Sequence, residues 1–135
     1  MTWYHEGVPY EYDGTHFGFV YLIENLTNGR KYIGRKYFSK AGVRQVNGKR
    51  KKIRKESDWA TYYGSNDTLK AEVAELGEHN YRRTILHLCK TKSEAAYLET
   101  YEIFTRHALL DELYYNDWCS CKIRRAHLKN LQTPT

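Results

Sequence analysis

The sequence predicts one α+β domain in which a small, three-stranded, mainly antiparallel sheet is flanked by helices. Two segments, 18–24 and 30–35, have strand-like patterns and are joined through an Asn-Gly pair, which is typical of β-hairpins. A third strand-like segment lies between two helical patterns further along the chain. The 135 residues suffice for a single domain with one modest core.

The N-terminal half contains the hairpin and two less regular segments. Residues 1–17 are aromatic and polar without clear periodicity, so we expect an extended arm. The hairpin follows in the stretch GFVYLIENLTNGRKYIGRK, residues 18–36. Residues 39–56 are strongly basic and include the letters VNGK, from which we expect a mobile loop.

A helix is predicted at about 66–76. Its apolar residues Leu69, Val73 and Leu76 recur at helical spacing, so they form one stripe that can face the sheet. Gly77 follows at the position where glycine commonly ends a helix.

The C-terminal half contains a third strand, a second helix and a tail. Residues 81–89, YRRTILHLC, alternate and then become apolar, as expected of a strand. Ser93 is a suitable N-cap for a helix that extends to about Arg106, with Glu94 in its first turn. The tail at 118–135 is basic and is expected to be a short helix or a mobile segment.

Charge is concentrated in one part of the chain. The formal net charge is +6, and the segment from Arg30 to Lys55 contains twelve Lys or Arg residues and no Asp or Glu. Such a run indicates either a polyanionic partner or a solvated loop, and we favour nucleic acid. The candidate nucleic-acid-binding residues are Arg30, Arg35, Lys49, Arg50, Lys51, Lys52 and Arg54.

Composition excludes several other classes of protein. The pI is about 9.2 and the mean hydropathy is −0.80. No apolar run approaches the roughly 20 residues needed to span a bilayer, and the first residues lack the features of a signal peptide. Three cysteines do not suggest a disulfide framework. We therefore expect a soluble, intracellular protein without a membrane partner.

Two tyrosines of the hairpin are candidate site residues. If the connection holds an even number of residues, Tyr21 and Tyr32 lie on the same face of the sheet. A four-residue loop at 25–28 places them directly opposite each other, whereas a tight Asn-Gly turn leaves them further apart. Gly34 on the same face leaves a gap beside them. Such a pair could handle a proton, or could be an ordinary stabilising cross-strand pair.

Glu99 and Asn116 are further candidates. Glu99 follows Ala95 and Ala96 by one turn and precedes Ile103 by one turn, so it lies in a mostly apolar stripe. A carboxylate there is costly unless it has a partner, such as a metal ion or an arginine. Asn116, in the YYN segment, can donate or accept a hydrogen bond near a site.

The segments FVY at 19–21 and YIG at 32–34, separated by a hairpin, resemble the two signatures of the GIY-YIG nuclease family. The first signature differs in its first two letters but keeps the tyrosine. LETYEI at 98–103 resembles the segment with the family's metal-binding glutamate, and YYN at 114–116 resembles its asparagine motif. The letters between them are also similar to those of phage members.

The resemblance implies DNA cleavage assisted by one divalent cation, Mg²⁺ or Mn²⁺. It gives Tyr21 the role of general base or proton relay, and gives Tyr32 a hydrogen bond to the attacking water or to a phosphate oxygen. A nearby metal and several cations are expected to favour the phenolate of Tyr21. Glu99 would bind the cation through oxygen.

The resemblance also implies a cation that neutralises charge on the phosphate in the transition state. The family has an arginine about ten positions after its second tyrosine. Here position 42 is glycine, so we choose Arg44 by spacing and keep Lys36 as the alternative.

Other arrangements carry less weight. Cys119 and Cys121 with His127 do not match the usual zinc spacings. Trp59 and Trp118 are expected to pack against the helices.

We therefore interpret the chain as a small GIY-YIG-type DNA endonuclease, in the host-cell cytoplasm if a phage encodes it. Its parts are an arm (1–17), a nuclease domain (18–117) with a basic insertion at about 39–56, and a basic tail (118–135). One site cuts one strand, so a double-strand break needs a dimer or two visits. The alternatives are a non-catalytic nucleic-acid-binding module of the same fold and a basic or ribosome-associated protein without a catalytic site.

Overall fold

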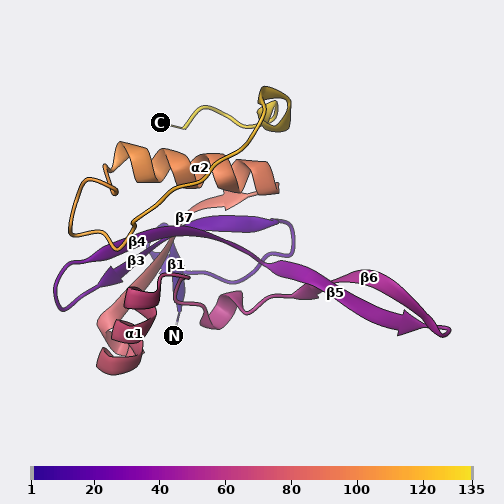
Figure 1. Cartoon of the computed structure of the whole chain (residues 1–135), viewed down its shortest axis with the longest axis horizontal. Coiled ribbons are helices and arrows are strands. Elements are labelled where there is room, and N and C mark those ends of the chain that lie inside the picture. The colour runs from indigo at the N-terminus through magenta and orange to yellow at the C-terminus, as the bar shows by residue number, and fades with distance from the viewer. Residues whose placement is uncertain (1, 135) are drawn as a thin grey trace.

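A computed structural model describes residues 2–134, so Met1 of the expected arm and Thr135 of the expected tail lie outside the described residues. A five-stranded mixed sheet, in the order β2-β1-β7-β3-β4, lies between helix α2 on one face and helix α1 on the other (Figure 1). The fold is α+β as predicted, but the sheet is larger than the expected three strands. The strands of this sheet are β1 (Trp3–His5), β2 (Val8–Pro9), β3 (Gly18–Asn25), β4 (Lys31–Tyr37) and β7 (Tyr81–Cys89).

The additional strands come from the N-terminal segment. β1 pairs in parallel with β7, and β2 pairs antiparallel with β1. Trp3 fixes this segment, because its ring is buried edge-on against Phe19 and its Nε1 donates to the Trp59 carbonyl at 2.8 Å. Strands of two and three residues are too short to show a period-2 pattern, which is why the sequence predicted only an extended arm.

Alternation along β3 divides the core into two clusters. Phe19, Tyr21 and Ile23 face α1 and the short helix that contains Trp59. Val20 and Leu22 face α2. Both faces of the sheet are therefore covered, as expected for a strand that is buried along nearly its whole length.

The register of the β3–β4 hairpin settles the position of the two tyrosines. Tyr21 pairs with Gly34 and Tyr32 pairs with Ile23, so the tyrosines share a face but are diagonal neighbours. Their ring centroids lie 6.2 Å apart. The prediction of a shared face is confirmed, whereas the directly opposite arrangement is wrong because the connection is longer than a four-residue loop.

The basic segment 39–56 is a β-hairpin and not the expected loop. β5 (Ser39–Val46) and β6 (Lys49–Glu56) pair antiparallel along their full length and project away from the main sheet (Figure 1). Asn47 and Gly48 form the turn, with φ values of 52° and 76°. Positive φ at both positions is the geometry that Asn-Gly pairs favour in two-residue hairpins. The run of positive charge obscured this turn signal in the sequence.

The two α-helices agree closely with the prediction. α1 (Asp67–Leu76) begins after Asn66, whose side chain caps the helix, and ends at Gly77 with φ 90°. α2 (Lys92–Thr105) begins two positions earlier than expected, because Thr91 and not Ser93 accepts the capping hydrogen bond from the Glu94 amide. The remaining helical elements are the 3₁₀ turns η1 (Trp59–Thr61), η2 (Glu78–Asn80) and η3 (Arg125–Leu128).

The chain after α2 returns along the outer edge of β4. Lys31 and Tyr114 form an isolated parallel bridge, in which the Lys31 amide donates to Leu113 and the Tyr115 amide donates to Lys31. The following residues, 116–120, run past β4 and α2. Within residues 2–134, neither helix combines the length and the apolar character needed to cross a membrane.

Candidate active site

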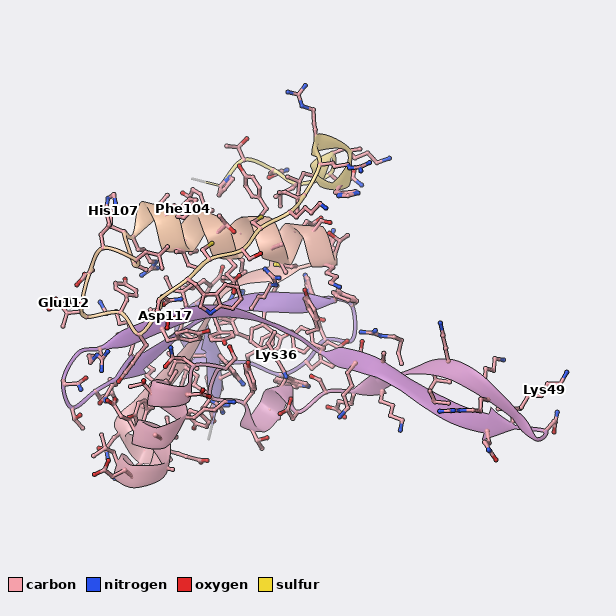
Figure 2. The ribbon with its side chains drawn as sticks, in the orientation of Figure 1. Lys36, Lys49, Phe104, His107, Glu112 and Asp117 are labelled. Atoms are coloured by element: carbon pink, nitrogen blue, oxygen red, sulfur yellow. The ribbon has the colours of Figure 1, made fainter. Side chains whose placement is uncertain are left out.

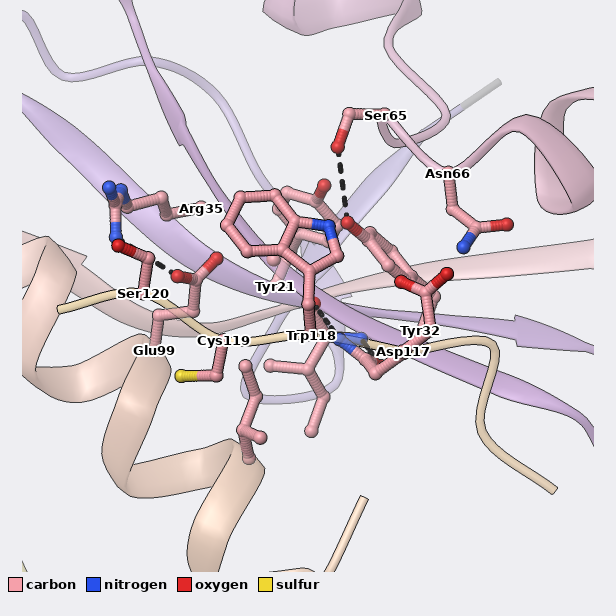
Figure 3. A pocket seen from close by; sticks show the side chains of 14 residues that line it. Tyr21, Tyr32, Arg35, Ser65, Asn66, Glu99, Asp117, Trp118, Cys119 and Ser120 are labelled. Atoms are coloured by element: carbon pink, nitrogen blue, oxygen red, sulfur yellow. Dashed lines mark hydrogen bonds and ion pairs between the residues drawn. The ribbon is translucent and has the colours of Figure 1, made fainter. Parts of the chain in front are cut away.

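A pocket of about 450 Å³ lies over the middle of β4 (Figure 3). Its walls come from β3, β4, α2, the segment before α1 and the returning chain. The pocket brings together four predicted site residues that lie far apart in the sequence, namely Tyr21, Tyr32, Glu99 and Asn116. Its other lining side chains include Arg35, Ser65, Asn66, Asp117, Trp118, Cys119 and Ser120.

Gly34 makes room for the phenol of Tyr21. The two residues are cross-strand partners, and a Cβ at position 34 would lie 2.3 Å from the Tyr21 hydroxyl oxygen. No side chain fits at that distance, so the hydroxyl reaches the pocket only because residue 34 is glycine. The predicted gap is the space left by the missing side chain of Gly34, and the Tyr21 phenol occupies it.

Tyr21 is deeply buried, with an exposed fraction of 1%. Burial raises the pKa of its phenol well above 10.0, and a hydrogen bond and charge interaction with Tyr62 raise it further. The protein groups around Tyr21 therefore favour the neutral phenol, and the expected phenolate stays a prediction that depends on a bound metal. The cause is that the phenol lies among other aromatic rings rather than beside a free cation.

Tyr32 is less deeply buried and contacts a residue that we did not single out from the sequence. Its hydroxyl oxygen lies 3.1 Å from the Ser65 Oγ, at hydrogen-bonding distance. Burial raises the Tyr32 pKa, and the Ser65 hydrogen bond partly opposes that rise. Ser65 comes from the segment before α1, and only the tertiary structure places it beside the tyrosine pair.

Glu99 is directed from α2 toward β4, as its apolar stripe predicted. Its carboxylate accepts a hydrogen bond from the Arg35 Nη1 at 3.0 Å, and its side chain is 16% exposed. Burial raises the pKa of Glu99, although Arg35 opposes that rise. The carboxylate therefore has one charged partner, and Figure 3 shows its second oxygen turned toward the interior of the pocket.

Asn116 holds the returning chain against β4. Its Oδ1 accepts from the Ile33 amide at 3.0 Å, and its Nδ2 donates to the Ile33 carbonyl at 2.8 Å. This side chain thus occupies the position of a neighbouring strand on the edge of the sheet. It contributes to the site by positioning the segment that follows it, because both of its polar atoms contact the backbone.

The two cations that we considered for phosphate neutralisation do not line the pocket. Arg44 is exposed on β5, where it pairs with Lys51, so the spacing argument that selected it does not apply to this chain. Lys36 forms an ion pair with Asp58 at 2.6 Å, and its Nζ lies 4.0 Å from the centre of the Tyr62 ring. Arg35 is the arginine that the structure brings to the pocket.

Trp118 was expected to pack against the helices, and for this residue the prediction is wrong. Its side chain is 72% exposed and lines the pocket. Trp59, in contrast, is buried against Phe38 and Phe19. A single tryptophan gives no periodic signal, so its exposure could not be read from the sequence.

The other predicted nucleic-acid-binding residues divide into two groups. Arg30 pairs with Glu72, in the middle of α1, at 3.4 Å and lies over the Tyr115 ring. The rest lie on the β5–β6 hairpin and are exposed, namely Lys49, Arg50, Lys51, Lys52 and Arg54.

The pocket contains carboxylates, which are ligands of the type that a hard cation takes. Glu99 and Asp117 both line it, whereas no group of three His, Cys, Asp or Glu side chains in residues 2–134 is arranged to hold a metal ion. Mg²⁺ typically binds through one or two carboxylates and takes its other ligands from water and substrate phosphates. A pocket of this volume has room for such ligands.

Comparison with known proteins agrees with this fold. Residues 3–119 match the family model described as "Putative endonuclease segE, GIY-YIG domain". Because the match extends over most of the chain, the chain belongs to the GIY-YIG endonuclease family, which confirms the resemblance seen in the sequence.

A particular relative of this class is a protein of Enterobacteria phage T4 with the same description, "Putative endonuclease segE". It is 35% identical over 100 residues, which are 74% of this chain and 40% of the phage protein. The chain thus spans less than half the length of this curated relative. No solved structure matches the chain.

Proposed function

We propose that this chain is a metal-dependent DNA endonuclease that hydrolyses phosphodiester bonds in the pocket over β4. The observation that carries the proposal is the meeting of Tyr21, Tyr32, Arg35 and Glu99 around one cavity. These side chains supply hydroxyl groups, a cation and a metal-binding carboxylate, which are the groups that phosphodiester hydrolysis requires. Membership of an endonuclease family supports the same activity.

Tyr21 acts in this proposal as a proton relay rather than as a phenolate base. Its raised pKa keeps the phenol neutral near pH 7, so it accepts the proton of the attacking water as its own hydroxyl proton passes to a neighbour. Tyr62 is the neighbour with which its hydroxyl interacts, and this partly exposed phenol releases its own hydroxyl proton to solvent water as it receives the one from Tyr21. Tyr32, held by Ser65, orients the water or a phosphate oxygen.

Arg35 takes the role for which we had selected Arg44. Its guanidinium has five donors, of which the Nη1 group contacts Glu99, so other donors are available for a phosphate oxygen. It neutralises charge on the phosphate in the transition state while it holds the carboxylate in place. Glu99 would hold Mg²⁺ or Mn²⁺, which when bound would polarise the scissile phosphate and stabilise the leaving oxygen.

The biological setting belongs to the same proposal. The phage origin of the segE relative supports action in the cytoplasm of a host cell. A single pocket cuts one strand at a time, so double-strand cleavage requires two copies or two successive visits.

A non-catalytic DNA-binding module is the second candidate function. The observation that favours it is the Glu99–Arg35 ion pair, which would also suit a purely structural role for the carboxylate.

Substitution of Glu99 separates the two functions. Glu99→Gln keeps the side-chain size but removes the charge that holds the cation, so we expect almost complete loss of plasmid cleavage in Mg²⁺ with DNA binding unchanged or stronger. Its melting temperature should stay equal or rise, because burial disfavours the charged carboxylate.

Glu102→Gln is a matched control for this experiment. Glu102 lies on the same helix outside the pocket and pairs with His87 and Arg106, so its variant should retain cleavage. Equal cleavage by wild type and Glu99→Gln would reject the metal-binding role. A lower melting temperature of Glu99→Gln, with no effect of Mg²⁺ on either protein, would support the structural module.

A further inference from the structure

The β5–β6 hairpin is a two-stranded ribbon that stands apart from the rest of the molecule. Figures 1 and 2 show it extending from the sheet, with Lys49 at its far end. Its eighteen residues, 39–56, contain eight Lys or Arg and one acidic residue, Glu56. Because the hairpin projects from the domain, packing against a core does not explain its presence. Its density of positive charge indicates a polyanionic partner.

The pairing register assigns the charges to two unequal faces. Cross-strand partners point to the same side of a ribbon, and side chains alternate along each strand. One face, which we call the cationic face, has five basic residues and no acid. Its basic residues are Lys40, Arg44, Lys49, Lys51 and Lys55. The opposite face carries Arg50, Lys52 and Arg54 together with Ala41, Val43 and Glu56.

Like charges face each other across the cationic face. Lys40 pairs with Lys55, and Arg44 pairs with Lys51. Directly opposed like charges destabilise an antiparallel pair, so this arrangement weakens the isolated ribbon. Phosphates placed beside both pairs would remove the repulsion, and binding of a polyanion would therefore stabilise the ribbon.

The base of the ribbon is firmly attached to the domain. The Arg54 guanidinium donates to the Ser39 carbonyl at 2.8 Å and lies over the Phe17 ring. Phe38, between β4 and β5, is buried among aromatic side chains. β4 lines the pocket, and β5 begins two residues after β4 ends, so the ribbon has a defined attachment to the candidate active site.

The dimensions and composition of the ribbon favour double-helical DNA. Eight residues per strand span roughly 25 Å, and the major groove of B-form DNA admits a two-stranded ribbon. Proteins bind single strands by stacking bases on aromatic side chains, but residues 39–56 include none of the chain's Trp, Tyr or Phe. The major groove of A-form RNA is too narrow for such an element.

We propose that the β5–β6 ribbon is a duplex-DNA-binding arm, which lies in the major groove beside the cleavage site with its cationic face turned toward the DNA. This inference rests on the proposed nuclease function and adds the substrate class, duplex DNA, and the element that binds it. The ribbon supplies affinity at a distance from the cut, whereas the pocket supplies the chemistry.

A pair of matched double variants tests which face binds. Arg44→Gln with Lys51→Gln removes two charges from the cationic face, and Arg50→Gln with Lys52→Gln removes two from the other face near the same end of the ribbon. All four side chains are exposed, so both variants should fold, which a melting curve checks. Binding of a short fluorescent DNA duplex is measured by anisotropy at several salt concentrations, with a chelator present to prevent cleavage.

The cationic-face variant should reduce the slope of log affinity against log salt by about 1.8, because each lost phosphate contact is worth about 0.9. The opposite-face variant should change the slope by less than half of that. Wild type should bind the DNA duplex more tightly than the single strand or an RNA duplex of the same sequence. Equal slopes for the two variants, no change in either, or equal affinity for the three nucleic acids would overturn the proposal.

This test is independent of the proposed nuclease activity. If the two double variants show the same salt slope while cleavage still depends on Glu99, only the proposed DNA-binding role of the ribbon is rejected. If Glu99→Gln still cleaves DNA while the two double variants differ in salt slope, only the proposed catalytic site is rejected.

Discussion

The pocket and the ribbon solve different physical problems within one chain. In the pocket, charges are paired and partly buried, as in the Glu99–Arg35 ion pair, and a buried phenol is surrounded by aromatic rings. On the ribbon, eight cations are solvent-exposed and no aromatic residue is present. The comparison indicates that catalytic side chains must be shielded from solvent and held by fixed partners. Cations that attract a polyanion must instead be exposed to solvent.

Tyr21→Phe tests the pocket side of this comparison and should have the largest effect of the variants that follow. It removes the hydroxyl but keeps the ring in the core, so folding should survive. Cleavage should fall by roughly 10²–10⁴-fold, which is the usual contribution of acid–base catalysis, while DNA affinity stays the same. Tyr97→Phe, on the exposed side of α2, is the control. Turnover near that of wild type would refute the role of Tyr21.

Replacement of Lys49, Arg50, Lys51 and Lys52 by alanine tests the ribbon side. Of these residues, Lys49 and Lys51 lie on the cationic face, and two phosphate contacts at about 0.9 each correspond to a salt slope flatter by about 1.8. KM should rise at moderate salt while kcat at saturating DNA changes little, because no substituted residue lines the pocket. A fall in kcat with KM unchanged would mean that the two regions are not separable.

Asn116→Ala tests whether the pocket depends on the returning chain. The variant leaves the amide and carbonyl of buried Ile33 without their partner. Each unsatisfied group costs about 1–3 kcal/mol, so we expect a loss of that order in the free energy of unfolding, measured in urea. Asn130→Ala, at an exposed position, should be neutral. Stability equal to that of wild type would show that the segment is held by other contacts.

The pH dependence of Glu102→Gln should give the smallest effect. Burial alone raises the pKa of Glu102, but hydrogen bonds from Arg106 and His87 outweigh it and lower the pKa below 4.5. A lowered pKa stabilises the fold above about pH 4.5, and that contribution disappears as the pH falls through the folded-state pKa. The variant should therefore melt below wild type at pH 7, and the gap should narrow in acid. A difference in melting temperature that stays constant from pH 7 into acid would contradict the lowered pKa of Glu102.

Much of the sheet could be predicted because its signals are local. The apolar run of β3, the partial alternation in β7 and the caps of α1 depend on residues close in sequence, and their predicted bounds were nearly correct. The parallel pairing of β1 with β7 joins segments about eighty residues apart, and so short a strand has no period to detect. The ribbon was missed because the basic segment 39–56 was expected to be a mobile loop despite its Asn-Gly turn.

Within the candidate site, two kinds of residue could be predicted from the sequence: those that belong to a motif, and a charged residue within an otherwise apolar helix face. The Tyr21–Tyr32 pair had the motif, and Glu99 was a carboxylate in an apolar stripe. Ser65 had neither, since only the tertiary fold brings it to the pocket. Arg35 follows the YIG segment and was predicted to bind nucleic acid, but its contact with Glu99 could not be predicted from the sequence. Arg44, chosen by its spacing along the sequence, does not line the pocket, because the chain leaves the main sheet after Tyr37 and places Arg44 on the β5–β6 hairpin.

The missing side chain at Gly34 has a consequence for the genetics of this protein. Every missense change in a glycine codon adds side-chain atoms, and at this position the first of them would collide with the Tyr21 hydroxyl. A selection for inactive alleles should therefore recover many changes at codon 34, although glycine has no reactive group. A second mutation that replaces or moves Tyr21 would remove this collision. Suppressors of changes at codon 34 should therefore be found at codon 21.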